Sequence, residues 1–152
     1  MTYHFNIHED ETSGYYAECI ELPDCATQGH TIEELRANMK DVLDLYLDEP
    51  EDSSIVFDPP DSTLKGPHIE AVPVDPFIAL KTSLRASRKY SGLTQTDVAK
   101  AIGAKSVHTY QRYESGEANP TLKTLIRLKQ VLPALDLNAI VESDDREPAG
   151  KR

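Results

Sequence analysis

The first part of the chain alternates between apolar and polar positions. Apolar side chains occupy every second position from Tyr3 to Ile7, which is the period of a strand with one buried face. Thr12-Ser13-Gly14 is typical of a hairpin turn, and a second strand is predicted over residues 15–22. A short third extended segment follows over residues 26–28. This part of the chain therefore predicts three short strands.

From residue 31 the apolar period changes from two to three and four. Thr31-Ile32-Glu33-Glu34 is a capping-box sequence, in which the Thr31 hydroxyl accepts from the third helical N–H and Glu34 reaches back. A helix is predicted from here to about Leu47, with one apolar stripe toward the sheet: Ile32, Leu35, Met39, Val42, Leu43 and Tyr46. Prolines then predict a loop, and residues 68–74 a last strand. The order is β-β-β-α-β.

Helical periods return after residue 76 and continue almost to the end of the chain. A first helix ends at Gly92, which suits a left-handed closing position, and Thr94 caps a second helix. Gly103 separates the second helix from a third. The sequence Asn119-Pro120-Thr121 begins a fourth helix, and residues 137–141 form a short fifth. The second part of the chain is therefore predicted to be all-helical.

These patterns predict an α+β chain of two small domains. The first domain covers residues 1–75, the second covers residues 76–142, and the polar tail over residues 143–152 is predicted to be disordered. Two domains of this size each have a small core, so oligomerisation is expected.

The net charge of −10 conceals a strong asymmetry. Residues 1–75 carry 18 acidic and 3 basic side chains, whereas residues 76–132 carry 3 acidic and 10 basic ones. Residues 133–152 carry 5 acidic and 3 basic side chains. A basic region attracts phosphates and an acidic region repels them, so the two parts are expected to bind different partners.

Other features narrow the class of protein. The sequence contains no apolar run of the roughly 20 residues that a membrane span needs, and the start of the chain is unlike a signal peptide. Cys19 and Cys25 form no metal-binding or disulfide pattern, which fits a cytoplasmic protein. The histidines lack metal-ligand spacing, and His4 and His8 are expected on a solvent-facing strand face. No metal, cofactor or membrane partner is predicted.

The segment from Gly14 to Glu34 resembles the HicB antitoxin domain. The shared pattern is a strand, the Pro23-Asp24 step, a short Thr-x-Gly segment at residues 27–29, and Thr-x-Glu-Glu opening a helix. The resemblance covers residues 2–75 and departs from the usual pattern at Cys25-Ala26. It implies a truncated ribonuclease-H-like sheet and a partner, a small basic HicA-type toxin that cleaves mRNA.

The implied partner gives the acidic half a task. An acidic surface covers the basic RNA-binding face of a ribonuclease and speeds association with it. The candidate toxin-binding residues, chosen by charge and position, are Glu9, Asp10, Glu18, Glu21 and Asp24. No catalytic residue is predicted, because Glu18 and Glu21 have opposite parity and point to opposite faces of a strand.

The basic half resembles the Cro/cI-type, XRE-like helix-turn-helix family over about residues 77–132. The matching residues are Leu93, Thr94, Gln95, Ala99, Gly103, Glu114, Gly116 and Pro120. Ala99 is small because the third helix crosses over it, and Gly103 turns the chain between the two helices. The resemblance implies an ion pair between Arg88 and Glu114 that locks the first helix to the third. It also implies a homodimer or a higher even oligomer, because the family commonly docks as a dimer on two half-sites.

The same resemblance implies the residues that contact operator DNA. This chain has one residue more than the common pattern between Gly103 and Glu114, which leaves open where the recognition helix starts. Arg112 is the first choice for base readout, since arginine bonds guanine bidentately. The complete predicted DNA-binding set is Gln95, Lys105, Ser106, His108, Thr109, Arg112 and Asn119.

Three hypotheses follow. The leading one is an antitoxin that masks a HicA-type ribonuclease and represses its own operon. The alternative is a stand-alone helix-turn-helix repressor whose N-terminal domain senses a ligand or mediates assembly. The third is a ribonuclease-H-like hydrolase tethered to DNA. A neighbouring reading frame for a small basic protein favours the first, ligand-dependent operator affinity the second, and metal-dependent cleavage the third.

Overall fold

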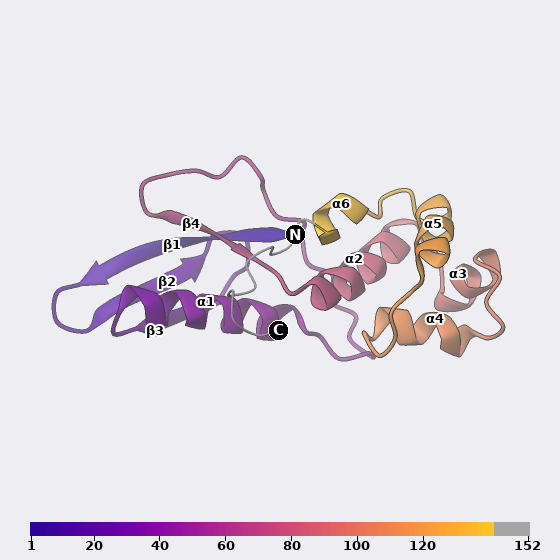
Figure 1. Cartoon of the computed structure of the whole chain (residues 1–152), viewed down its shortest axis with the longest axis horizontal. Helices are drawn as coiled ribbons and strands as arrows, with labels where there is room; N and C mark the ends of the chain where they lie inside the picture. The colour runs from indigo at the N-terminus through magenta and orange to yellow at the C-terminus, as the bar shows by residue number, and fades with distance from the viewer. Residues whose placement is uncertain (142–152) are drawn as a thin grey trace.

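The computed structural model describes residues 1–141 and has an elongated shape, with a sheet at one end and a group of helices at the other (Figure 1). The first part contains β1 (Thr2–Asp10), β2 (Gly14–Cys19), β3 (Ala26–Gly29), α1 (Ile32–Leu47) and β4 (Ile69–Pro73). The second contains α2 (Pro76–Tyr90), α3 (Gln95–Ala101), α4 (Val107–Glu114), α5 (Leu122–Val131) and α6 (Leu137–Val141). The polar tail predicted from residue 143 lies outside the described residues.

The strands form one antiparallel sheet in the order β3-β2-β1-β4, and α1 covers one of its faces. Phe5 on β1 and Ala17 on β2 are fully buried, and so are Leu35, Met39 and Leu43 of α1. This arrangement confirms the predicted order of elements and the predicted apolar stripe of the helix.

The short Thr-x-Gly segment has a packing role. A Cβ atom on Gly29 would lie 2.6 Å from the backbone nitrogen of Leu35, so only glycine lets β3 come this close to α1. The Thr31 hydroxyl accepts from Glu34 N–H, as the capping sequence predicts. The Glu34 carboxylate accepts from His30 N–H at 2.8 Å, one residue before the position that a capping box would use.

The second strand is shorter than the sequence predicted. It ends at Cys19 rather than at residue 22, because residues 20–25 form a turn that folds back beside the strand. Asp24 has a left-handed φ of 63°, and Cys19 N–H donates to the Cys25 carbonyl at 2.8 Å. Leu22 and Cys25 are buried within this turn. Strand periodicity extends through Leu22, but the backbone reversal interrupts the pairing.

His4 is a second correction. Its face of β1 was expected to be solvent-facing, yet only 8% of the residue is exposed. The Glu21 carboxylate explains this burial, because it accepts from His4 N–H at 2.9 Å and lies 2.7 Å from Nδ1 of the ring. The turn at residues 20–25 therefore folds over this end of the sheet face.

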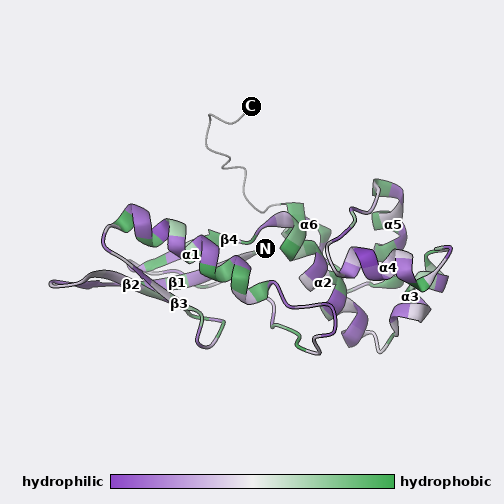
Figure 2. Cartoon of the chain, turned by 90° about the horizontal axis from the view of Figure 1, so that it is seen from below, coloured by the Kyte–Doolittle hydropathy of each residue, from purple (hydrophilic) through white to green (hydrophobic). Residues whose placement is uncertain are grey.

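The helical part contributes Leu84, Val98, Ile102, Tyr110 and Leu128 to a buried cluster that continues from the sheet part. In Figure 2, α6 is mostly hydrophobic, whereas α4 is mostly hydrophilic. Asp75 caps α2 by accepting from Phe77 N–H at 2.9 Å, and its own N–H donates to Asp44 of α1 at 2.8 Å. The two parts therefore meet along α2. No helix within residues 1–141 is long and apolar enough to cross a membrane.

Candidate nucleic-acid interface

The helix α3 begins with a complete capping box. Thr94 N–H donates to Asp97 Oδ2 at 2.8 Å, and Asp97 N–H donates to the Thr94 hydroxyl at 3.1 Å. These bonds satisfy backbone donors that the first helical turn leaves free. The hydrogen bonds from Thr94 also lower the pKa of the Asp97 carboxyl. The start of α3 is therefore held firmly in place.

The turn between α3 and α4 depends on two small residues. Ala99 is 3% exposed, which lets α4 pack closely over α3. Gly103 adopts a left-handed φ of 73°, a conformation that favours glycine. Residues 104–106 complete the turn before α4 begins at Val107. The helix that the sequence predicts to read DNA therefore begins at Val107, after this turn.

The exposed face of α4 carries polar side chains suited to the major groove. His108 and Arg112 are exposed and stand one helical turn apart, and Thr109 between them is half-buried. Lys105 and Ser106 are exposed in the preceding turn, and Asn119 is exposed after the helix. The guanidinium of Arg112 lies 3.9 Å from the exposed Glu117 carboxylate, a surface pair that leaves the side chain half-exposed.

A buried ion pair fixes α4 to α2. Arg88 Nε donates to Glu114 Oε2 at 2.8 Å, and Arg88 Nη2 donates to Oε1 at 2.6 Å. Only 2% of Glu114 is exposed, and Arg88 Nη1 also donates to the Leu93 carbonyl at 3.1 Å. Burial by itself raises the pKa of Glu114 and is the largest single influence. The hydrogen bonds and the charge of Arg88, together with contributions from Tyr110 and Gln95, outweigh burial and bring the pKa below its ordinary value.

Gln95 turns toward the protein rather than standing free. Its Oε1 accepts from Gln111 Nε2 at 3.1 Å, and its Nε2 lies 3.5 Å from Glu114 Oε1. The residue is half-buried at the start of α3. The structure thus brings Gln95 close to α4 and uses much of its amide in contacts between the two helices.

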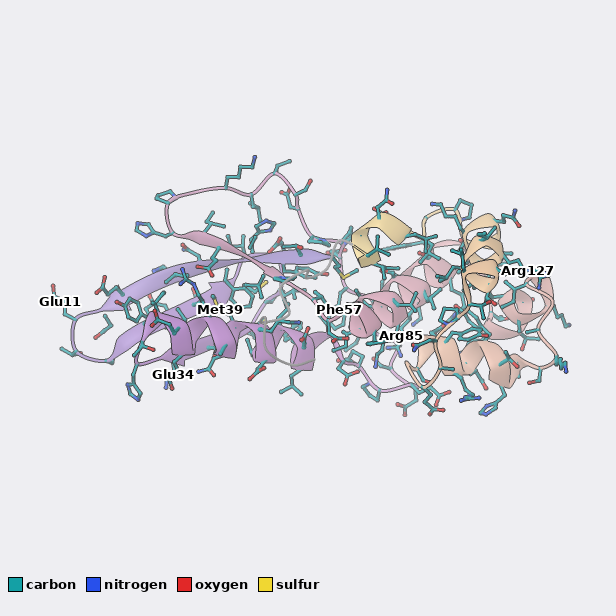
Figure 3. All side chains as sticks on the ribbon, in the orientation of Figure 1. Glu11, Glu34, Met39, Phe57, Arg85 and Arg127 are labelled. Carbon is teal, nitrogen blue, oxygen red and sulfur yellow. The ribbon has the colours of Figure 1, made fainter. Side chains whose placement is uncertain are left out.

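Sequence reasoning missed Arg127 of α5. This exposed arginine reaches the turn between α3 and α4, where its Nη1 donates to the Ile102 carbonyl at 3.3 Å (Figure 3). It is 25 residues distant from Ile102, and the apolar stripe of its helix gave no sign of this contact. The signal available from the sequence was only its position within the basic region.

The predicted acidic set is spread over the sheet end of the molecule. Glu9 and Asp10 are exposed near the β1–β2 turn, Glu18 is exposed on β2, and Asp24 is exposed in the turn after it. Hydrogen bonds from Thr12 and Ser13 lower the pKa of Asp10 to about 2. Glu21 differs from the others, because His4 occupies its carboxylate.

The sheet face opposite α1 forms a surface that we call the open sheet face: Asn6, His8, Asp10, Tyr16, Glu18 and Gln28. The His8 and Tyr16 rings stack with centroids 4.5 Å apart, and Tyr16 is 43% exposed. The surface combines aromatic area with carboxylates and carries no lysine or arginine. Among residues 1–141, no group of three or more His, Cys, Asp or Glu side chains is arranged to hold a metal ion.

Comparison with known proteins finds a family match for part of the chain. The helix-turn-helix family matches residues 84–138, which include α3, α4 and α5. No curated protein matches the chain closely enough to count as a relative. The family match supports DNA binding and transcription regulation by the helical part, and its position coincides with the exposed face of α4.

Proposed function

We propose that this chain is an antitoxin that masks a small basic ribonuclease of the HicA type and represses its own operon. The observation that carries the proposal is the separation of two surfaces in the structure. The helix-turn-helix lies at one end of the long axis, and the acidic sheet lies at the other (Figure 1). One chain can therefore contact DNA and a protein partner without the two competing for the same surface.

The DNA-binding role is supported by the geometry of α4. A recognition helix must present polar side chains to base edges while its opposite side is anchored in the domain. His108 and Arg112 supply the exposed face, and the buried pair of Arg88 and Glu114 supplies the anchor. Lys105 and Ser106 precede the helix, where side chains commonly contact phosphates.

The partner-binding role is supported by the chemistry of the open sheet face. Ribonucleases that grip RNA present basic surfaces, and an acidic partner favours association with such a surface. The exposed Tyr16 ring offers the aromatic contact area that often contributes strongly to protein interfaces, and Glu18 lies beside it on the same strand face. We therefore place the toxin on this face, with Glu18 facing its basic groups.

Charge reversal at Glu18 tests this placement. Glu18→Lys should weaken binding of the purified HicA-type partner by about tenfold or more, mainly through slower association at low salt. Asp41→Lys is the matched control, because Asp41 is exposed on α1, on the other side of the sheet. The association rates are measured by surface plasmon resonance. Equal effects of Glu18→Lys and Asp41→Lys would contradict binding of the partner at the open sheet face.

A second candidate function is favoured by a cavity at the junction of the two parts. This cavity of about 790 Å³ is bounded by the start of β1, residues 57–62, α2 and the segment around α6. The Thr82 hydroxyl beside it is buried and finds no hydrogen-bond partner among the described residues. A small molecule bound there would make the chain a ligand-sensing repressor. This function predicts that operator affinity changes with the concentration of that ligand and that no toxin is encoded beside the chain.

A further inference from the structure

A row of three basic residues runs along α2. Lys81, Arg85 and Lys89 are spaced four residues apart, so they share one face of the helix. From charge alone such a row would be assigned to DNA. In the structure it faces residues 48–54, which follow α1 and which we call the connector.

Each member of the row contacts one point of the connector. Lys81 forms an ion pair with Asp48, and Arg85 Nη2 donates to the Pro50 carbonyl at 2.9 Å. Lys89 Nζ donates to the Ser54 carbonyl at 2.7 Å. Only 8% of Lys81 and 5% of Arg85 are exposed. The connector therefore covers much of the row.

Arg85 also reaches the recognition helix. Its Nε lies 3.9 Å from Glu114 Oε1, the carboxylate that Arg88 already holds through two hydrogen bonds. Two guanidinium groups thus share one buried carboxylate, which leaves one positive charge in excess. Because a buried charge is costly without a partner, the Pro50 carbonyl that accepts from Arg85 has an electrostatic role.

We propose that Arg85 is a positioning residue for DNA recognition, through which the connector helps to set the orientation of α4. This inference rests on the DNA-binding part of the proposed function. The contact chain runs from the N-terminal part through Pro50 and Arg85 to Glu114 at the end of α4. In Figure 3, Arg85 lies in the middle of the molecule, at the junction rather than at the end that carries Arg127.

The salt dependence of DNA binding separates a positioning residue from a phosphate contact. Each lost phosphate contact reduces the slope of log affinity against log salt by about one. Loss of a positioning residue changes the fit of α4 to its operator while the number of phosphate contacts stays the same. We therefore expect a lower operator affinity with an unchanged slope for variants at Arg85.

The experiment uses the full chain and a duplex that the wild-type protein selects from a random pool. Affinities for this duplex and for an unrelated duplex are measured at several salt concentrations for Arg85→Met, Arg85→Lys and Lys105→Ala. Arg85→Met should lose about 2- to 30-fold in affinity for the selected duplex, with little change on the unrelated one. Arg85→Lys should lose less, because lysine can reach one of the two partners. Lys105→Ala should reduce the slope by about one.

A connector variant keeps the test decisive if Arg85→Met fails to fold. Asp48→Asn leaves Arg85 intact and removes the carboxylate charge that Lys81 contacts, while the side-chain oxygen of asparagine can still accept from Lys81. Asp48→Asn should cause part of the loss of affinity for the selected duplex that Arg85→Met causes. In a chain that already carries Arg85→Lys, Asp48→Asn should cause no further loss. The inference is overturned if Arg85→Lys reduces the slope of log affinity against log salt. It is also overturned if Arg85→Lys and Asp48→Asn both leave the affinity for the selected duplex unchanged. Failure of the wild-type chain to select any duplex would instead overturn the proposed DNA-binding function.

Discussion

At the scale of single residues, Arg112 has the exposure and the position that base readout requires. Arg112→Ala should cost about 1–3 kcal/mol at one operator position and relax specificity there. Lys105→Ala is the comparison, because loss of a phosphate contact weakens binding to all sequences by a similar factor. Affinities for a set of single-base operator variants provide the measurement. A uniform loss for Arg112→Ala would make this arginine a phosphate contact instead.

Glu114 links the stability of the helical part to pH. Its pKa in the folded chain lies below the ordinary value of 4.5, so the stabilisation is complete above that value. It is lost as the pH falls through the folded pKa, when the carboxylate takes up a proton. Glu114→Gln should therefore be less stable than wild type by about 3–5 kcal/mol at neutral pH, since removing one charge leaves arginine buried without its partner.

The free energies of unfolding of the wild-type chain and of Glu114→Gln should become more similar at acidic pH. Denaturant unfolding followed from pH 7 to pH 3 should show the difference shrinking only below about pH 4.5. A difference that stays constant across this range would mean that the charge of Glu114 contributes nothing to stability. Comparison with Glu114→Gln isolates this residue from the other carboxylates that titrate in acid.

At the scale of secondary-structure elements, α5 has an exposed apolar face. Leu122 is 73% exposed and Ile126 is 51% exposed, one helical turn apart. A single helix-turn-helix binds DNA weakly, and proteins of this kind commonly dock as dimers on two half-sites. We therefore expect α5 to contribute to a homodimer interface.

A charged residue on this face tests the expectation. Ile126→Asp should weaken dimerisation by about tenfold or more, because a carboxylate would be buried at the interface. Leu45→Asp is the control, since Leu45 is 77% exposed on α1 in the other half. Sedimentation equilibrium gives the dimer constants. A wild-type monomer, or an unchanged dimer of Ile126→Asp, would contradict this assignment of α5.

Periodicity and capping signals located nearly all of these elements in advance. The helices were predictable because their apolar stripes and capping residues, such as Thr94, are local in sequence. The end of β2 was missed, because the reversal at Asp24 depends on backbone conformation rather than on hydrophobic pattern. The burial of His4 was missed because Glu21, its partner, comes from a turn 17 residues away.

The candidate site also contains features that are local in the sequence and features that depend on distant contacts. The positions of His108 and Arg112 on α4 followed from the helical period and the motif. The roles of Gln95, Arg85 and Arg127 depend on contacts between residues that are far apart in the chain. A basic side chain in the sequence does not reveal whether it faces DNA, a carbonyl or a buried carboxylate. Only the folded structure separates these cases.

At the scale of the whole molecule, the acidic half and the basic half lie at opposite ends of one packed chain. α2 joins them through the contact of Asp75 with Asp44 and through the connector, and the pair of Arg88 and Glu114 ties α2 to α4. Binding of the proposed partner at the sheet would therefore leave the exposed face of α4 free. This arrangement suits a protein that both masks a toxin and represses its operon.

Co-expression with the small basic HicA-type partner that the proposal requires tests the antitoxin proposal most directly. Pull-down on this chain and size-exclusion chromatography then show whether a complex forms. The proposal predicts a stable complex in which the partner's toxicity is silenced. Absence of a complex, together with intact operator binding, would contradict it and leave a helix-turn-helix repressor whose N-terminal part has another task.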